Sequence, residues 1–455
     1  MVAPIRIRRG MDIRLAGAPA PEVHSLPDPP VVALYPPEFD GVRPRLLVEE
    51  GAEVRRGDPL IEDKRNPALK LAAPAGGRVL AVRRGERRAI LAIEIERSDR
   101  EETVDFGAHS IESIDALSRE AVLERLLRTG LLALIRQRPF SHMADPENRP
   151  AAIFVNGMNT APFTPDLAVA LEGREAAFAA GLRAMARLTD GLVHLCLAEG
   201  APAPEPPPGE RLRVHRFSGP HPAGNTSVHI HHIDPIREGR KVWTVRGEDL
   251  VLIGELLLGG ALPTHRVIAL GGPGVRESER RHLRVRIGSP LGAVLEGRMV
   301  PGETRAIAGD ALSGRAFAAD EGIGWRDTAV TVVPEGRERA FLGWLMPGWR
   351  QFSHSRTFLS AWLGRNRRWD HTTNLHGSPR AMILTGLYDR VMPMRILTDF
   401  LVRAVLAHDV DEAVRLGLLE TDPEDFALPA FLCPSKTDLP GIIRAGLAEA
   451  EAEGL

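Results

Sequence analysis

The fold is decided by three neighbouring runs: AAIFVNG at residues 151–157, PDLAVALEGREAAFAAGLRAMARL at 165–188, and GLVHLCL at 191–197. Two short apolar runs on either side of a long alanine-rich run are typical of two parallel strands joined by a helix. We expect that helix to break once, near Gly173. The run LRVHRF at 212–217 is expected to add a third strand. The sequence therefore predicts a Rossmann-like α/β domain.

This α/β domain, which we place at residues 106–258, lacks the glycine pattern of a dinucleotide site. The run GGPG at 271–274 follows a predicted strand, but it does not have the G-x-G-x-x-G spacing. Its Pro273 also removes one of the backbone N–H groups that a phosphate needs. No GK[ST] motif of a P-loop occurs anywhere in the chain. We expect a tight turn at 271–274 and no nucleotide site in the domain.

The composition excludes several classes of protein. The 455 residues include 58 Lys and Arg and 60 Asp and Glu, which gives a net charge of −2 and no basic surplus for nucleic acid. The two cysteines, Cys196 and Cys433, are too few for a disulfide scaffold or a cysteine-ligated iron–sulfur cluster. No run reaches the roughly 18–20 apolar residues of a membrane span. Motifs of a self-contained hydrolase or kinase are missing as well.

Both ends of the chain differ in character from its centre. Residues 1–105 consist of short apolar runs cut by Gly and Asp-Pro turns, which predicts a small β-barrel. Residues 259–330 suit a second small α+β domain. From 331 to 455 the chain is mostly helical, with helical spacing at 397–407, 410–418 and 439–450 in particular.

Two local features allow more than one interpretation. Lys64, in EDKR at 62–65, is either part of a solvated charged hairpin or a modified lysine of the lipoyl kind. The segment 341–369 contains four tryptophans, five arginines and no acidic residue before Asp370. It is either a docking surface near a membrane, where Trp and Arg are enriched, or a tryptophan-rich core.

A histidine-rich stretch is the nearest approach to a metal site. His221 and Gly224 lie in GPHPAG at 219–224, and His229 and His231 follow in HIHHIDP. We expect His229 and His231 to share one face of a strand. With His221 they could then ligate zinc or iron, or they could be hydrogen-bonded imidazoles of a structural motif. No helix-spaced histidine pair supports a metal, so we expect none.

Motifs along nearly the whole chain resemble one family in the same order. They are IRIRRGMDI at 5–13, EDKRNP at 62–67, RPFS at 138–141, GPHPAG at 219–224, HIH at 229–231, PEGRER at 334–339, FLGW at 341–344, RTFLS at 356–360 and RVMP at 390–393. The family is that of the A subunit of the bacterial Na+-translocating NADH:quinone reductase. The resemblance implies a barrel-sandwich (lipoyl/biotinyl-like) domain at 1–105, the Rossmann-like domain at 106–258, a small β-grasp (SLBB-type) domain at 259–330, and a mostly helical domain at 331–455.

The resemblance also implies a function. The complex oxidises NADH, reduces ubiquinone and exports Na+, and this subunit lies peripherally on the cytoplasmic side of the bacterial inner membrane. It would be held there only by the other subunits. The subunit looks like the flavin- and NADH-binding subunit of respiratory complex I after losing those sites, and is related to the Rnf complex C subunit. We therefore expect no cofactor on this chain, no catalytic residue and no metal, with ubiquinone as the substrate of the complex.

One motif is the best candidate for contact with ubiquinone, since the resemblance links this subunit to quinone binding. It is RQRPFS at 136–141. The Phe140 ring could stack on the quinone head, while Arg136, Arg138 and Ser141 could hydrogen-bond its carbonyls. The same residues also suit a rigid interdomain linker. The alternative functions are therefore a structural scaffold without a quinone site and a lipoyl-type carrier.

Overall fold

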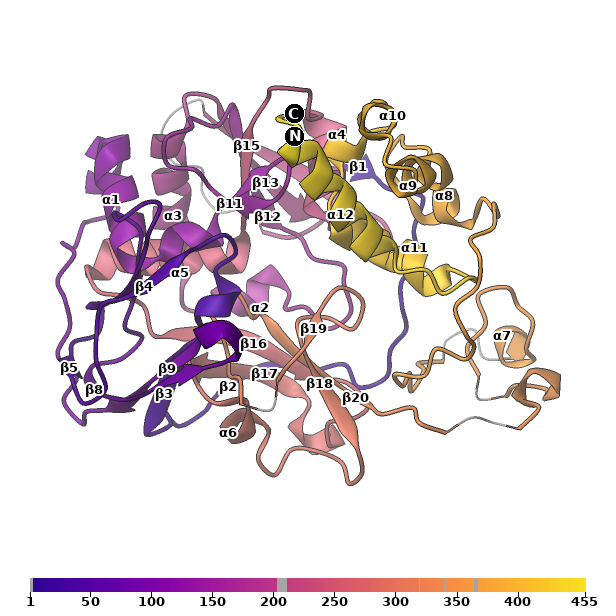
Figure 1. Cartoon of the computed structure of the whole chain (residues 1–455), viewed down its shortest axis with the longest axis horizontal. Coiled ribbons are helices and arrows are strands. Elements are labelled where there is room, and N and C mark those ends of the chain that lie inside the picture. The colour runs from indigo at the N-terminus through magenta and orange to yellow at the C-terminus, as the bar shows by residue number, and fades with distance from the viewer. Residues whose placement is uncertain (1–2, 203–210, 319, 339–340, 350, 364–366) are drawn as a thin grey trace.

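The computed structural model describes residues 3–202, 211–318, 320–338, 341–349, 351–363 and 367–455 (Figure 1). Within them the chain forms four sheets of seven, six, four and three strands, followed by a group of C-terminal helices. The predicted combination of a barrel-sandwich domain, a Rossmann-like domain, an SLBB-like domain and a helical C-terminus is confirmed.

The seven-stranded sheet forms the centre of the α/β domain. In sheet order its strands are β1 (Ile5–Arg6), β14 (Leu212–Ser218), β13 (Leu192–Ala198), β12 (Ala152–Gly157), β15 (Val242–Arg246), β10 (Arg136–Arg138) and β11 (His142–Met143). The strands from β1 to β15 are parallel, whereas β10 and β11 are antiparallel. The expected strands at 151–157, 191–197 and 212–217 are thus confirmed.

The two faces of this sheet bury different cores. Because side chains alternate along a strand, Ile153 and Val155 of β12 face α3 (Glu175–Leu188) and α5 (Gly247–Gly259). Ala152 and Phe154 face α4 (Thr226–Ile233) and the C-terminal helices. The sheet is therefore covered by helices on both sides, as a buried parallel sheet requires.

The expected break in the long helix is confirmed. A short α2 (Leu167–Leu171) ends before Gly173, and α3 begins after it. Gly173 itself has a φ of +70°, which a right-handed helix cannot contain.

The histidine stretch is a helix, so the prediction that His229 and His231 share the face of a strand is wrong. Both lie in α4. A helix turns about 100° per residue, so side chains two positions apart point in nearly opposite directions. Ser227 to Ile230 are all buried, and a short apolar segment of this kind cannot be assigned to helix or strand from its periodicity.

The N-terminal barrel sandwich consists of the two small sheets. Their strands are β3 (Val31–Leu34), β9 (Ile90–Arg97), β8 (Gly77–Arg84) and β5 (Glu53–Val54) in one, and β4 (Pro44–Leu46), β6 (Pro59–Asp63) and β7 (Lys70–Ala72) in the other. Lys64 is exposed at the end of β6. Helix α1 (Arg119–Thr129) follows the barrel and ends at Gly130, whose φ of +81° favours glycine.

The six-stranded sheet belongs to the SLBB-like domain. Its strands, in order, are β19 (Arg315–Ala316), β18 (Thr304–Ala308), β20 (Ala329–Pro334), β16 (His265–Gly271), β17 (Arg281–Arg286) and β2 (Ala20–Ser25). The short α6 (Leu291–Leu295) contributes to its core. The expected turn after β16 is present, and at Gly272 a side chain would overlap the carbonyl oxygen of Val332.

The first residues of the chain belong to sheets other than the barrel. Strand β1 extends the seven-stranded sheet by pairing with β14, and β2 extends the six-stranded sheet by pairing with β17. The domain boundaries at 105, 258 and 330 stay a prediction.

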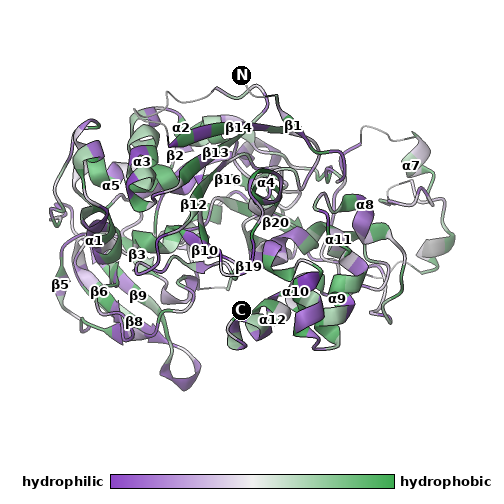
Figure 2. Ribbon diagram, turned by 90° about the horizontal axis from the view of Figure 1, so that it is seen from above, coloured by the Kyte–Doolittle hydropathy of each residue, from purple (hydrophilic) through white to green (hydrophobic). Residues whose placement is uncertain are grey.

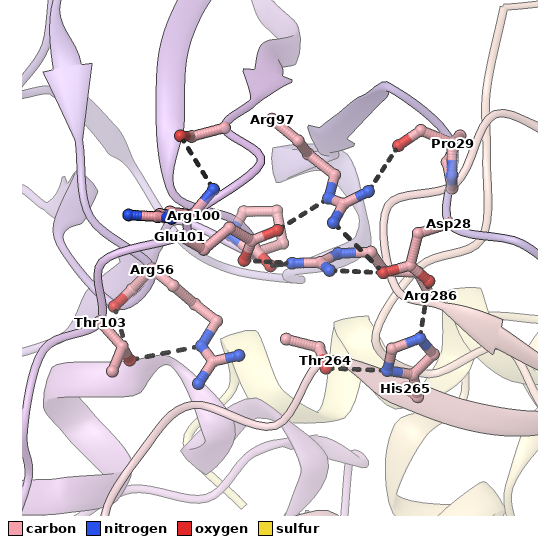
Figure 3. A network of polar contacts seen from close by, with 12 residues as sticks. Asp28, Pro29, Arg56, Arg97, Arg100, Glu101, Thr103, Thr264, His265 and Arg286 are labelled. Carbon is pink, nitrogen blue, oxygen red and sulfur yellow. Dashed lines mark hydrogen bonds and ion pairs between the residues drawn. The ribbon is translucent and has the colours of Figure 1, made fainter.

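A network of charged side chains joins the barrel to the six-stranded sheet (Figure 3). The guanidinium of Arg286, on β17, lies 2.7 Å from Asp28 and 2.6 Å from Glu101. Arg97 pairs with the same two carboxylates, and His265 lies 2.8 Å from Asp28. Although burial opposes ionisation, the hydrogen bonds from Arg97 and Arg286 lower the pKa of Glu101. Asp28 and Glu101 are therefore ionised and hold the two domains together.

The C-terminal region is helical. Its helices are α7 (Ser360–Leu363), α8 (Leu387–Val391), α9 (Thr398–Leu406), α10 (Val410–Arg415), α11 (Ala427–Leu432) and α12 (Leu439–Ala452). The predicted helices at 397–407, 410–418 and 439–450 are confirmed. None of the helices in the described part of the chain has the length and apolar character needed to span a membrane.

Candidate functional site

Two adjoining cavities lie at the carboxyl ends of the parallel strands. The smaller, of about 440 Å³, is lined by Asn156 and Gly157 at the end of β12 and by Arg246 at the end of β15. In the sheet, β13 and β14 lie on one side of β12, and β15, which follows them in the chain, lies on its other side. The order of the strands therefore reverses at β12. A crevice at such a switch point is the usual ligand site of an open α/β sheet.

The larger cavity, of about 800 Å³, contains the predicted quinone motif. Arg136, Arg138, Phe140 and Ser141 all line it. They lie on the β10–β11 hairpin at the edge of the seven-stranded sheet. The two cavities share lining residues from every part of the fold, namely Asp40, Thr226, Ser313 and Glu424 among others. The structure therefore brings the four predicted residues together at a junction of all four domains.

The turn of the hairpin has an unusual backbone. Phe140 and Ser141 have φ values of +73° and +54°. A left-handed conformation costs a non-glycine residue about 1–2 kcal/mol, and such strained residues cluster at functional sites. The Ser141 hydroxyl donates a hydrogen bond to the Asp422 carboxylate, which ties the turn to the C-terminal region.

Arg138 has a different role from the one its position in the motif suggests. Its side chain is only 3% exposed, and it donates to Ser227 Oγ at 2.9 Å and to the carbonyl of Thr421 at 2.6 Å. A third bond reaches the carbonyl of Glu420 at 3.1 Å. These bonds connect β10 to α4 and to the C-terminal helices, so Arg138 positions the hairpin.

Three arginines come together where the two cavities meet. Arg136 and Arg326 both approach Asp40, at 2.9 and 3.8 Å, and Arg246 lines both cavities beside them. Burial, followed by the charges of Arg136 and Arg246, lowers the pKa of Arg326 to about 10. The place where the cavities meet thus offers guanidinium N–H donors, which suit an electron-rich oxygen, beside the carboxylate of Asp40.

Carboxyl groups line the same walls. Burial, followed by the charge of Asp327, raises the pKa of Glu38 to about 8. Burial also raises the pKa of Glu248 and, together with Asp422 and Asp425, that of Glu424. The raised pKa values of Glu38 and Glu424, both about 8, favour protonated carboxyl groups beside the arginines at neutral pH.

Asp249 fixes the arginine that closes the end of β15. Its carboxylate lies 2.7 Å from Arg246 and 3.2 Å from the buried Arg266. Arg246 also donates to the carbonyl of Arg326 at 2.7 Å. Although burial opposes its charge, Asp249 and Glu248 raise the pKa of Arg246. This buried group joins α5 to the six-stranded sheet.

The histidines are not gathered into one site. His221 and Gly224 line the smaller cavity, with His221 Nδ1 3.1 Å from Thr160 Oγ1. His229 is buried, with Nε2 3.0 Å from the carbonyl of Ala223, and burial lowers its pKa to about 3. His231 instead pairs with Glu420 at 2.6 Å. No group of three or more metal-ligating side chains occurs among the described residues.

Several residues of the site could not be found from the sequence. Asp422, Glu424, Arg246 and Arg326 line the cavities but lie far from the 136–141 motif in the chain. The only local signal is TDPED at 421–425, where Asp422 and Asp425 form a capping box. That pattern predicts a helix start, and it carries no information about a cavity.

Three family models match the chain. They are described as "NqrA N-terminal barrel-sandwich hybrid domain" over residues 5–98, "NqrA second alpha/beta domain" over 117–262, and "NQRA C-terminal domain" over 267–319. Together they cover the barrel, the α/β domain and most of the six-stranded sheet.

Curated relatives match over almost the full length. The A subunit of the "Na(+)-translocating NADH-quinone reductase" of Yersinia pseudotuberculosis serotype O:1b (strain IP 31758) is 41% identical over 451 residues, which is 99% of this chain and 100% of the relative. The chain belongs to the family of Na+-translocating NADH-quinone reductase A subunits. The NqrA relative of Serratia proteamaculans (strain 568) is 40% identical over 452 residues, again 99% of this chain and 100% of the relative.

Among solved structures, a chain of an NAD+-reducing [NiFe]-hydrogenase in the H2-reduced state is similar at 13% identity and a TM-score of 0.34. The match covers 78% of this chain and 67% of that chain. The membership in the NqrA family therefore comes from the sequence relatives and the family models.

Proposed function

We propose that the chain works as the A subunit of a Na+-translocating NADH:quinone reductase and contributes a ubiquinone site at the larger cavity. In this proposal the chain is peripheral on the cytoplasmic side of the inner membrane, assembles with the other subunits and carries no cofactor of its own. Ubiquinone is the substrate of the complex, whose turnover exports Na+. The observation that carries the quinone site is the position of Arg136, Phe140 and Ser141 on one wall of the larger cavity.

The chemistry of that wall suits a quinone head group. The Phe140 ring offers a flat apolar face for stacking. The Arg136 guanidinium can donate to a quinone carbonyl and stabilise the negative charge that develops there during reduction. Asp422 orients the Ser141 hydroxyl, and Arg138 holds the hairpin in place. Binding, orientation and charge stabilisation are the tasks assigned to this chain.

A second candidate, a scaffold protein without a quinone site, has one observation in its favour. The bonds that Arg138 donates all go to protein groups, and they tie β10 to α4 and the C-terminal helices. A hairpin built only to join domains would have the same bonds. The two candidates differ in whether Arg136 and Phe140 contact a ligand.

The test is a titration of the purified chain with a short-chain ubiquinone, followed by tryptophan fluorescence. Trp243 is a suitable reporter because its indole N–H donates to Gln137 of the hairpin at 3.1 Å. We expect saturable quenching by ubiquinone in the wild type. In Phe140→Ala and in Arg136→Gln the Kd for ubiquinone should rise about tenfold, which corresponds to a loss of about 1.4 kcal/mol of binding free energy.

Matched controls are Phe400→Ala on α9 and Arg128→Gln on α1, whose side chains are exposed away from the cavity. They should bind quinone as the wild type does. The Phe140 and Arg136 variants should also raise the KM for quinone in the assembled complex. Absence of saturable binding in the chain together with an unchanged KM in the complex would favour the scaffold.

A further inference from the structure

The exposed apolar side chains of this protein are concentrated in one segment. Of the 18 large hydrophobic side chains that are exposed among the described residues, 11 lie between Phe341 and Leu384. They are Phe341, Leu342, Leu345, Met346, Trp349, Leu359, Trp362, Leu363, Leu375, Ile383 and Leu384. We call the described residues of this segment, 341–349, 351–363 and 367–384, the arm. The side chains of three tryptophans in this segment are described, and of these Trp349 and Trp362 are exposed while Trp369 is buried. The exposure favours the predicted docking surface over the predicted tryptophan-rich core.

The arm projects from the rest of the fold. In both Figure 1 and Figure 2, α7 lies at one end of the molecule, beyond α8 and α11. Its base is fixed: the backbone of Trp369 bonds to Arg14 and Ala16, and its ring packs against Phe352. Phe352 in turn contacts Phe431 of α11. A fixed base and an exposed apolar tip indicate a surface that meets something outside the chain.

The charge of the arm and its flanks is predominantly positive. Between Glu338 and Asp389 the sequence has seven arginines and one acidic residue, Asp370, in a chain with a net charge of −2. The side chains of Arg339, Trp344, Arg350 and Arg365 lie outside the described part. Two of the other guanidinium groups lie over indole rings: Arg356 is 5.9 Å from the Trp362 centroid, and Arg367 is 5.0 Å from that of Trp369.

These features are those of a protein surface at the level of lipid headgroups. Tryptophan prefers the membrane–water interface, and arginine prefers anionic phosphates. The seven arginines against one acidic residue complement the negative charge of lipid phosphates, and this charge is the reason for choosing an anionic lipid surface as the partner. We propose that the arm binds an anionic lipid surface directly, with Trp349, Trp362 and Leu363 at the depth of the headgroups. This goes further than the expectation that partners alone hold the chain at a membrane.

The experiment is flotation of the purified full-length chain with protein-free vesicles. One set contains phosphatidylglycerol and phosphatidylcholine, and the other contains phosphatidylcholine alone. We expect binding to the anionic vesicles that falls as salt is raised, because surface electrostatics are screened. In the double variant Arg356→Gln/Arg367→Gln the affinity for anionic vesicles should fall about fivefold for each arginine that is removed. In Trp362→Ser/Leu363→Ser binding should be lost.

Matched controls keep the test specific. Leu47→Ser/Leu91→Ser changes two exposed leucines of the barrel, and Arg128→Gln changes an exposed arginine of α1. Both should bind vesicles as the wild type does. Circular dichroism of each variant identifies any loss of folding, and tryptophan quenching by brominated lipids supplies a second readout.

Two results would overturn the proposal. One is absence of binding to anionic vesicles by the folded wild type. The other is binding that the arm variants leave unchanged. If the arm variants instead lose only their assembly with the other subunits, the arm is a protein interface and the lipid proposal is wrong. The quinone titration uses no vesicles, so failure of one proposal is distinguishable from failure of the other.

Discussion

At the scale of single residues, the site depends on groups whose ionisation differs from that in water. Glu38 is the clearest case. It lines the smaller cavity, and its carboxylate accepts the backbone N–H of Trp325 at 2.7 Å. Burial raises its pKa from the usual 4.5 to about 8. The folded chain therefore binds more protons at this position than the unfolded chain does between pH 4.5 and 8.

The sign of the resulting pH dependence follows by linkage. Because the folded state holds the extra proton, Glu38 lowers the free energy of unfolding progressively as pH rises from 4.5 to 8. Glu38→Gln removes this effect and keeps an acceptor for Trp325. We expect equal stability of variant and wild type at about pH 4.5, and a gain of about 1–3 kcal/mol in the variant at about pH 8.5.

Denaturant unfolding at both pH values measures this difference. The exposed Glu49 offers a control, since Glu49→Gln should leave the stability unchanged at either pH. A gain in Glu38→Gln that is the same at the acidic and the alkaline pH would show that Glu38 does not titrate in this range.

The residue scale is also where sequence reasoning reaches its limit. The motif at 136–141 stands out in the sequence by its aromatic and cationic side chains, and these residues do line a cavity. What Arg138 does there depends on Thr421 and Ser227, which are distant in the chain. No local pattern connects such partners, so the positioning role of Arg138 is visible only in the structure.

At the scale of elements, α3 and α5 show how closely the α/β domain is packed. A side chain on Gly254 of α5 would overlap the carbonyl oxygen of Ala177 on α3. We expect Gly254→Ala to force the helices apart and to cost about 1–3 kcal/mol. Thermal unfolding of the purified chain tests this.

The same helix supplies the control for that substitution. Gly259 is in α5, exposed, with nothing within 4 Å of an added Cβ atom. Gly259→Ala should raise stability by up to about 1 kcal/mol, because alanine is the better helix former. If both substitutions changed the stability alike, the close approach of α3 and α5 would not be what requires glycine at position 254.

Elements with clear periodicity were predictable, whereas the short, buried helix α4 was not. The spacing at 397–407 and 439–450 corresponds to α9 and α12, each with one apolar face. In contrast, α4 presents buried residues at four consecutive positions, so its HIH pattern suggests a strand. The packing of α4 between the sheet and the C-terminal helices decides its conformation.

At the scale of the whole molecule, the charged network of Figure 3 holds the barrel against the six-stranded sheet. Arg286 is its central residue, only 4% exposed, and pairs with Asp28 and Glu101. Arg286→Met would leave two carboxylates without their buried partner, which costs about 3–5 kcal/mol. We expect a lower unfolding midpoint and earlier proteolysis near the domain junction.

Arg284→Met is the matched control, since this arginine is on the same strand but exposed. It should unfold as the wild type does. Unfolding of Arg286→Met at the wild-type denaturant concentration would show that the network does not join the two domains energetically.

The first two strands have a consequence for how the chain is made. Ile5 pairs with Phe217, and Val23 pairs with His282. During synthesis these N-terminal strands leave the ribosome long before their partners exist, whereas the barrel that follows them can already close. Domains otherwise tend to fold in order from the N-terminus. Here edge positions of two sheets are filled by strands that are made before the barrel, so two sheets in later domains are completed only when this earlier segment returns to them.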